Sequence, residues 1–175
     1  SVNPLVKTVS IPNGVDLDKF NPKIKPIEIK LKKPIILNVG VVGSFKRQDL
    51  LLKASQYSVL LVGKGGNMAF VHKDMPRVYT ACDLFSYPTS PQESFGIAIL
   101  EAMASGLPVV ATDDPIRREI VGEAGLFVDP TDTSTYSQAL KKALNTNWGD
   151  KPRQQAAKFS WDKIAVQYDQ LFKKI

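Results

Sequence analysis

The apolar positions of this chain change repeatedly between two periods. Short, nearly continuous runs of apolar residues, such as 34–39, are typical of strands that are buried on both faces. Between these runs apolar residues recur every three or four positions, which indicates amphipathic helices. Strands are predicted at 34–39, 59–62, 84–87, 108–111 and 126–128, and helices at 47–56, 75–82, 95–105, 116–121, 133–144 and 161–175. The alternation predicts an α/β fold of βαβ units around a parallel sheet.

Loops that contain glycine follow three of the predicted strands, at 40–43, 63–66 and 90–96. In a parallel α/β sheet, ligands bind at the carboxyl ends of the strands, where such loops gather. The loop 63–66 alone is a weak phosphate-binding signal, because it lacks the Lys-Ser/Thr pair of a P-loop. We therefore expect a ligand site at this edge of the sheet.

Length and composition indicate how many domains the chain forms and the redox state of its compartment. The chain has 175 residues, 43% of them apolar and 23% charged, as expected of one globular domain. Its single cysteine, Cys82, cannot form an internal disulfide, which favours a reducing compartment. No apolar run approaches the ~20 residues of a membrane span. The sequence begins with Ser1 rather than Met, which suggests a piece of a longer protein.

The net charge of +6 favours anionic partners such as phosphorylated small molecules or membrane headgroups. Much of the excess lies in residues 21–34, where prolines and alternating isoleucines indicate an extended, solvated connector. A nucleic-acid partner is disfavoured, because no aromatic residues are interleaved with these lysines. The lysines of this segment are Lys23, Lys25, Lys30, Lys32 and Lys33.

The stretch 93–112 carries the most informative chemistry. Its first residues bring a loop into a predicted helix, and Gly96 removes a side chain where the backbone must be approached closely. The free N–H groups and the positive dipole end of such a helix form an anion site. Glu93 and Glu101 flank this site, and their carboxylates are suited to accept hydrogen bonds from hydroxyl groups. In the alternative interpretation, Glu93 only caps the helix and Glu101 is an exposed helix residue.

The two glutamates match an E-x7-E signature, and further segments match in order along nearly the whole chain. On these motifs the sequence closely resembles the C-terminal domain of the retaining glycosyltransferases of family 4, also called group 1 glycosyltransferases. The further matching segments are 11–16, 38–40 with Lys46 downstream, 61–65, 79–85, 108–112 and 125–128.

The resemblance implies a Rossmann-like, doubly wound parallel sheet with helices on both faces, the C-terminal half of a GT-B enzyme. Residues 1–175 would then form a single domain that binds a UDP-, GDP- or ADP-linked sugar. The complete enzyme would be a hexosyltransferase that transfers this sugar with retention and without a metal ion. The N-terminal, acceptor-binding half is absent from this sequence, so the isolated chain is expected to be inactive. The final helix, about 161–175, is expected to lean back on that half.

By the same resemblance, Glu101 would bind the ribose hydroxyls and Glu93 the hydroxyls of the donor sugar. Lys46 would neutralise the diphosphate as it leaves, an effect on the order of 3 kcal/mol. Catalytic roles are therefore expected for Lys46 and Glu93, with no cofactor. The expected donor-binding residues are Gly40, Lys46, Arg47, Glu93, Ser94, Phe95, Gly96, Ile97 and Glu101, with His72 as a candidate base contact.

The sequence departs from the family's pattern in two places. The family commonly has an arginine directly after the glycine at Gly40, where this chain has Val41. Arg47 is a candidate to compensate, although it follows Lys46 directly and neighbouring residues of a helix point about 100° apart. The segment 63–70 is also short, because a helix and loop common in the family are trimmed. These departures favour an alternative, a catalytically impaired nucleotide-sugar binding module of the same fold.

Other candidate residues have ordinary interpretations. The D-x-D string at 16–18 belongs to an Asn-Gly turn rather than to a metal site. Residues 113–115 follow a predicted strand and are expected to form a turn or a helix cap. Cys82 is expected in the core, and Trp161 and Tyr168 are expected to pack against other residues.

The expected partners are the nucleotide sugar and the N-terminal half in cis. A Rossmann-like domain for a dinucleotide is a rival hypothesis, and the missing G-x-G-x-x-G argues against it. The complete enzyme is expected in the cytoplasm, peripheral to the membrane if its acceptor is a lipid that the basic surface could approach.

Overall fold

The computed structural model describes residues 8–90 and 92–174, and it contains one five-stranded sheet. Each strand pairs with its neighbours in parallel, in the order β2-β1-β3-β4-β5. Because the order runs outward from β1 in both directions, this is the doubly wound, Rossmann-like fold that the sequence predicts. The strands are β1 (Ile35–Val39), β2 (Ser58–Val62), β3 (Leu84–Tyr87), β4 (Val109–Thr112) and β5 (Gly125–Val128).

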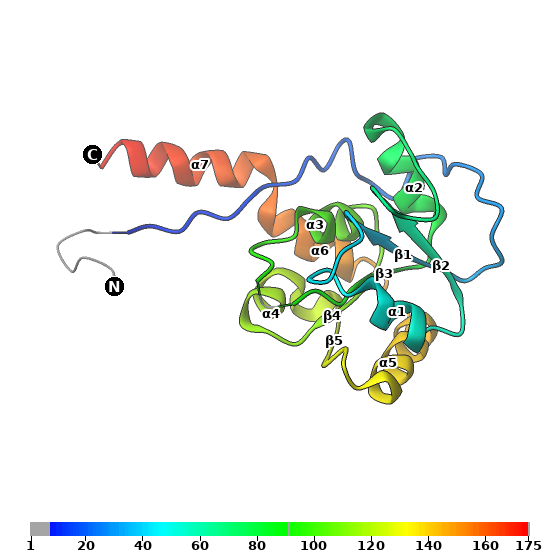
Figure 1. Cartoon of the computed structure of the whole chain (residues 1–175). Helices are drawn as coiled ribbons and strands as arrows, with labels where there is room; N and C mark the ends of the chain where they lie inside the picture. Colours follow the sequence, from blue (N-terminus) through cyan, green and yellow to red (C-terminus); the bar gives the residue numbers. More distant parts are fainter. Residues whose placement is uncertain (1–7, 91, 175) are drawn as a thin grey trace.

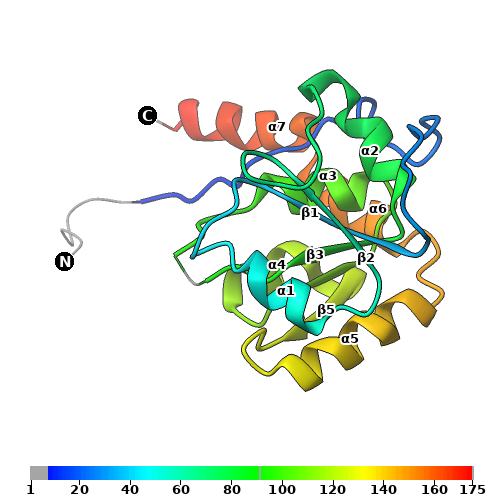
Figure 2. The ribbon, with the colours of Figure 1, turned by 45° about the vertical axis from the view of Figure 1, so that its right-hand side comes forward.

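Helices cover both faces of the sheet (Figures 1 and 2). One face carries α1 (Gln48–Ala54) and α5 (Thr133–Asn145). The opposite face carries α2 (Met75–Ala81), α3 (Ile97–Ala104), α4 (Pro115–Val121) and α6 (Lys151–Ala156). The predicted strands and helices are all confirmed, with ends that differ by a few residues.

Alternation along each strand divides the core between these two faces. In β1, Ile35 and Leu37 pack into one cluster and Ile36 into the other. All three are buried, because the sheet has helices on both sides. A nearly continuous apolar run is thus the pattern of the inner strands, and the polar residues within it, Asn38 and Ser86, are buried with hydrogen-bond partners.

Three short 3₁₀ helices and α6 have no counterpart in the sequence prediction. The 3₁₀ helices are η1 (His72–Asp74), η2 (Gly122–Ala124) and η3 (Ala157–Phe159). The sequence of α6, KPRQQA, has little apolar periodicity, so its pattern resembles that of a loop. Tertiary contacts maintain it instead: Pro152 and Ala156 are buried, and Gln155 donates to the carbonyls of Glu119 and Ile120.

The segment that precedes the sheet is joined to the segment that follows α6. The Val15 N–H donates to the Phe159 carbonyl over 2.9 Å, and the Trp161 N–H donates to the Val15 carbonyl over 3.2 Å. Arg153 adds bonds to three carbonyl oxygens, those of Leu17, Phe20 and Ala104. The connector at 21–34 forms no helix or strand, as predicted.

The last helix, α7 (Trp161–Phe172), projects from the body of the domain (Figure 1). Ser160 caps it by accepting from the Lys163 N–H. Within this domain Ile164 is its only buried residue, whereas Trp161 and Tyr168 are exposed. The expectation that Trp161 and Tyr168 pack is therefore wrong for Tyr168, which touches mainly Phe172. Trp161 is half exposed, and its ring lies against Gly14. The predicted last residue, 175, lies outside the described residues.

Candidate functional site

The carboxyl ends of β1 and β3 bring together Lys46, Tyr87 and Glu93. Lys46 follows β1, Tyr87 ends β3, and Glu93 lies in the loop before α3. The Lys46 ammonium forms a hydrogen-bonded ion pair with the Glu93 carboxylate and lies 3.1 Å from the Tyr87 hydroxyl. Both partners of the pair are largely buried, so a ligand that reaches this point meets a preformed cation and carboxylate.

The loop that carries Lys46 is fixed by a buried amide. Gln48, at the start of α1, is 2% exposed. Its side chain accepts from the Gly43 N–H and donates to the Val41 carbonyl over 3.2 Å. The stem of Lys46 passes 3.5 Å from the position that a Cβ would occupy on Gly40, which directs the ammonium toward Glu93.

The electrostatics favour a charged Lys46 beside a neutral Tyr87. Burial lowers the pKa of Lys46, but the hydrogen bonds with Glu93 and Tyr87 outweigh it, so the pKa lies above its ordinary value. Burial raises the pKa of Tyr87, which keeps its hydroxyl protonated. At neutral pH the cluster therefore holds one cation, one carboxylate and one neutral hydroxyl.

The amino terminus of α3 lies next to this cluster and is open. Gly96 is the N-cap residue, in the left-handed conformation with φ 82°, and it provides no side-chain cap. The helix N–H groups that point out of this first turn have no partner within the helix. Ser94 is exposed, Ile97 is half exposed, and Phe95 packs edge-on against Phe159.

Glu101 lies one turn further along α3 and forms a second cluster. Its carboxylate accepts from the Tyr79 hydroxyl over 2.7 Å, and Tyr79 is fully buried. Burial raises the pKa of Glu101, while Tyr79 and the nearby charges of His72 and Lys19 oppose the increase. Lys19 Nζ lies 3.1 Å from His72 Nε2. The interpretation of Glu101 as an exposed helix residue is therefore wrong.

We expect Tyr79→Phe to raise the pKa of Glu101, because it removes a hydrogen bond that stabilises the ionised carboxylate. A raised carboxyl pKa makes the folded state bind its proton more tightly, so the variant should lose more stability at pH 7 than at acid pH. Carbon-13 NMR of the glutamate carboxyls against pH measures the shift. Tyr136→Phe is the matched control, because Tyr136 is equally buried but bonds Ser86 on the other face of the sheet. An unchanged Glu101 titration would contradict the prediction.

Arg47, predicted to bind the donor, lies outside the hydrogen-bonded Lys46 cluster. Arg47 has φ 52° at the N-cap of α1, and its charge acts on Asp129, whose pKa is lowered mainly by hydrogen bonds from Thr131. Among the described residues, no hydrogen bond or ion pair joins Arg47 to Lys46 or Glu93. Val41 is 57% exposed, and its side chain offers no charge to a ligand.

The site also contains residues that the sequence analysis did not select. Lys19 comes from the N-terminal segment, Gln48 from α1, and Tyr79 and Tyr87 from α2 and β3. Lys19, Tyr79 and Tyr87 are far in sequence from their partners, for example 41 positions between Tyr87 and Lys46. Gln48 bonds nearby residues, but its polar side chain gives no signal of its burial. Only the 93–101 stretch carries a local signal, because its members lie together in the loop before α3 and in the first turns of that helix.

The turn, cap and core interpretations of residues 16–18, 113–115 and Cys82 are confirmed. Asp16 accepts from the N–H groups of Asp18 and Lys19 and so closes a turn. Asp114 caps α4 by accepting from the Arg117 N–H. Burial raises the pKa of the Cys82 thiol to about 12, which makes it an inert core residue. Across residues 8–90 and 92–174, no group of three His, Cys, Asp or Glu side chains is placed to hold a metal ion.

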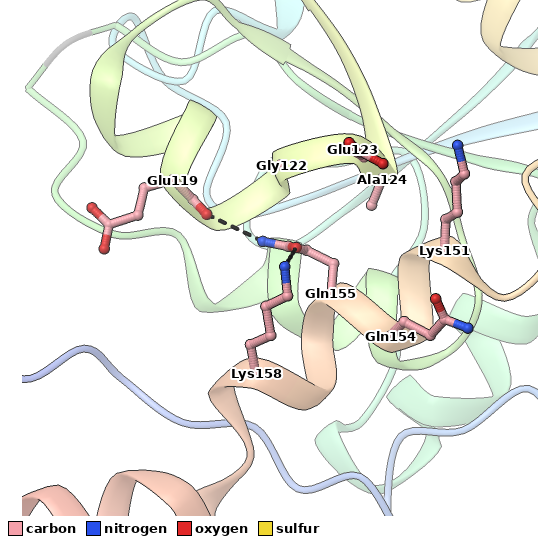
Figure 3. Close-up of a pocket in the computed structure, with 8 residues that line it drawn as sticks. All are labelled: Glu119, Gly122, Glu123, Ala124, Lys151, Gln154, Gln155 and Lys158. Atoms are coloured by element: carbon pink, nitrogen blue, oxygen red, sulfur yellow. Dashed lines mark hydrogen bonds between the residues drawn. The ribbon is translucent and has the colours of Figure 1, made fainter.

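A separate hollow of about 340 Å³ lies between α4, η2 and α6 (Figure 3). Its floor is formed by Gln155, which bonds the Glu119 carbonyl and accepts from Lys158. The charges around it are mixed, with Glu119 and Glu123 facing Lys151 and Lys158. None of the predicted site residues lines it. None of the described helices has the length and apolar character needed to cross a membrane.

A Rossmann-like sheet with this charged cluster at its carboxyl edge defines a domain suited to a phosphorylated ligand. Residues 37–146 match the family described as Glycosyl transferases group 1, and the chain belongs to that family. O-antigen chain mannosyltransferase B of Escherichia coli is 32% identical over 83% of this chain and 38% of its own length. A D-inositol 3-phosphate glycosyltransferase of Corynebacterium jeikeium is 30% identical over 94% of this chain and 51% of its own length. The chain thus spans about half or less of these relatives.

Solved structures agree on the GT-B fold. Sucrose-phosphate synthase of Thermosynechococcus elongatus matches with a TM-score of 0.77 and 25% identity, over 94% of this chain and 51% of that structure. Anabaena Alr3699/HepE, solved in complex with UDP and glucose, matches with a TM-score of 0.78 and 18% identity, over 94% and 56%. The fold and family predictions are therefore confirmed.

Proposed function

We propose that this chain is the donor-binding domain of a retaining hexosyltransferase that uses a UDP-, GDP- or ADP-linked sugar. One observation carries the proposal: the Lys46–Glu93 pair and Glu101 flank the open amino terminus of α3 at the carboxyl edge of the sheet. A diphosphate needs positive charge and N–H donors, and the two sugars beside it need hydroxyl acceptors. The α3 amino terminus and Lys46 would supply the positive charge and N–H donors, and Glu93 and Glu101 would supply the hydroxyl acceptors on either side.

Each site residue then has a role in the proposal. Glu101, oriented by Tyr79, accepts from the ribose hydroxyls, and His72 lies on the side expected for the base. The backbone of Gly40 and the N–H groups of Phe95, Gly96 and Ile97 face the diphosphate and sugar. Lys46 stabilises the leaving diphosphate, with Glu93 on the donor sugar. Positive charge comes from Lys46 and the α3 dipole, so the proposed transfer requires no metal ion.

The free domain suggests how the donor enters. Lys46 is paired with Glu93 before any donor binds. A diphosphate that takes Lys46 as its counterion would release the Glu93 carboxylate, which could then accept from sugar hydroxyls. One exchange of partners would thus couple diphosphate binding to sugar binding.

The complete enzyme would add an N-terminal acceptor-binding half in cis, and the chain alone would not turn over. The exposed apolar residues of α7, among them Val166 and Phe172, would pack on that half. The enzyme is proposed to act in the cytoplasm, with its lysine-rich connector against anionic headgroups if the acceptor is a lipid. Failure of anionic liposomes to retain it at low salt would contradict that last point.

Val41 favours a second candidate, a nucleotide-sugar binding module that does not catalyse transfer. The exposed apolar side chain at this position leaves Lys46 as the only cation hydrogen-bonded to the Glu93 carboxylate among the described residues. The module would bind the donor as well as the enzyme does. It would show no turnover even when joined to its N-terminal half.

The decisive test is thermal unfolding of the chain with UDP, GDP, ADP and their glucose or mannose conjugates. Ligand at ~100 Kd adds about 2.7 kcal/mol of stability, which raises the midpoint by roughly 5 to 11 °C. We expect one base to stabilise the chain and Glu101→Gln to abolish the effect. Glu123→Gln, at an exposed site in η2, is the matched control and should respond like the wild type. A flat panel, or a response that survives Glu101→Gln, would overturn the proposal.

A further inference from the structure

Arg117 is an arginine with no exposed surface, in the first turns of α4. Burial of a guanidinium is costly unless its N–H groups have partners. Nothing in the sequence pattern marks this residue, which lies in a polar stretch, PIRREIV, where Arg118 is solvent-exposed. The partners of its side chain therefore indicate what the buried charge does.

Two of those partners, Thr89 and Glu93, belong to the loop between β3 and α3 rather than to α4. One terminal nitrogen, Nη2, donates to the backbone carbonyl of Glu93 over 2.7 Å and to the Thr89 hydroxyl over 3.1 Å. The Asp114 carboxylate, 3.4 Å from Nε, supplies the counter-charge. The guanidinium also lies 6.0 Å from the centre of the Tyr87 ring.

Glu93 is consequently held at two points. Its carbonyl is bonded to Arg117, and its carboxylate is bonded to Lys46. The loop is anchored once more through Thr89, whose carbonyl accepts from the Thr112 hydroxyl over 2.7 Å. Arg117 thus connects α4 to the backbone that carries the Glu93 carboxylate.

We propose that Arg117 is a positioning residue that fixes the backbone of Glu93 and thereby sets the sugar end of the donor site. This inference rests on the proposed donor-binding function. Arg117 itself is too deeply buried to touch a donor. An arginine suits the task because its planar fork donates to several acceptors at once, whereas a lysine ammonium is a single point of charge.

Two variants weaken the hydrogen bonds between Arg117 and the Glu93 loop to different degrees. Arg117→Lys keeps the charge and loses the fork. Thr89→Val keeps the shape of the residue and removes one acceptor, so it serves if the lysine variant does not fold. Arg118→Gln is the control, because Arg118 pairs with Asp113 at the surface.

The measurement compares each donor with its own nucleotide: UDP-glucose with UDP, GDP-mannose with GDP, and ADP-glucose with ADP. Loss of a charge-assisted hydrogen bond that orders Glu93 should lower the affinity for the sugar conjugate about tenfold. The affinity for the bare nucleotide depends on Glu101 and Lys46, which both variants leave in place, and should change by less than about twofold. A general loss of stability would lower both affinities together and leave their ratio unchanged.

Amide exchange measured by NMR supplies a readout that needs no ligand. The Glu93 N–H donates to the Ser90 carbonyl over 3.1 Å, and its exchange should quicken in both variants. The Leu140 amide in α5, on the other face of the sheet, should not change. A folded variant with the wild-type affinity ratio and wild-type Glu93 exchange would overturn the inference. If the wild type binds none of the six probes, the proposed function fails, and the exchange data alone decide whether Arg117 orders Glu93.

Discussion

Replacing Lys46 with methionine is expected to lower the affinity of the chain for a nucleoside diphosphate about a hundredfold. Two effects act in the same direction. The variant removes the cation that would bind the diphosphate. It also leaves the largely buried Glu93 carboxylate without its partner, so a negative charge faces the incoming anion. Isothermal titration with the nucleotide that stabilises the wild type measures the loss.

The double variant Lys46→Met with Glu93→Gln separates the two effects. Removing the carboxylate should restore about tenfold of the lost affinity, because only the repulsion is relieved. Lys64→Met is the matched control, since Lys64 lies on the neighbouring loop and is exposed. A Lys46→Met variant with wild-type affinity would exclude Lys46 from the diphosphate site.

Val41→Arg, made in a complete enzyme, should raise the rate of transfer only if the missing arginine limits it.

Gly96→Ala is expected to destabilise the domain by about 3 kcal/mol. The left-handed conformation costs a residue with a Cβ roughly 1–2 kcal/mol. The added Cβ would also lie 2.9 Å from the Tyr87 ring, which is buried and stacked on Phe85 and so cannot move aside. The unfolding midpoint should fall by roughly 6 to 12 °C.

Comparison with Gly149→Ala separates the steric part of that loss from the backbone part. Gly149 also has positive φ, at 52°, but nothing lies within 4 Å of the position its Cβ would occupy. Its substitution should cost only the backbone term, roughly 1–2 kcal/mol. Equal losses at the two positions would show that Tyr87 does not constrain Gly96.

The fold could be predicted from the sequence because its strands are buried on both sides. Short and nearly continuous apolar runs, like the one in β1, are typical of strands in a sheet that helices cover on both faces. The α6 helix could not be predicted, since its polar sequence becomes helical only through contacts of Arg153 and Gln155 with distant carbonyls. Tyr168 was mispredicted because helical spacing shows which residues share a face but not whether this domain covers that face.

The candidate site was predictable only where its residues are close in sequence. Glu93, in the loop before α3, and Glu101, within α3, belong to one short motif, and the family resemblance added Lys46. The second partners of these residues, Arg117 and Tyr79, come from other elements and have no spacing in common with them. Arg47 illustrates the opposite case: it is adjacent to Lys46 in sequence, yet its left-handed backbone places its charge near Asp129.

The contacts of Arg153 bear on the order of folding. It bonds the carbonyls of Phe20 and Leu17, which lie 133 and 136 positions away in sequence. Closing a loop of that length loses conformational entropy, and the contact stabilises the chain only after the loop has closed. Such bonds therefore form late. The sheet would therefore assemble before the N-terminal segment docks on α6. Because Lys19 lies on that segment beside Glu101, the nucleotide end of the site would be the last part of the domain to be completed.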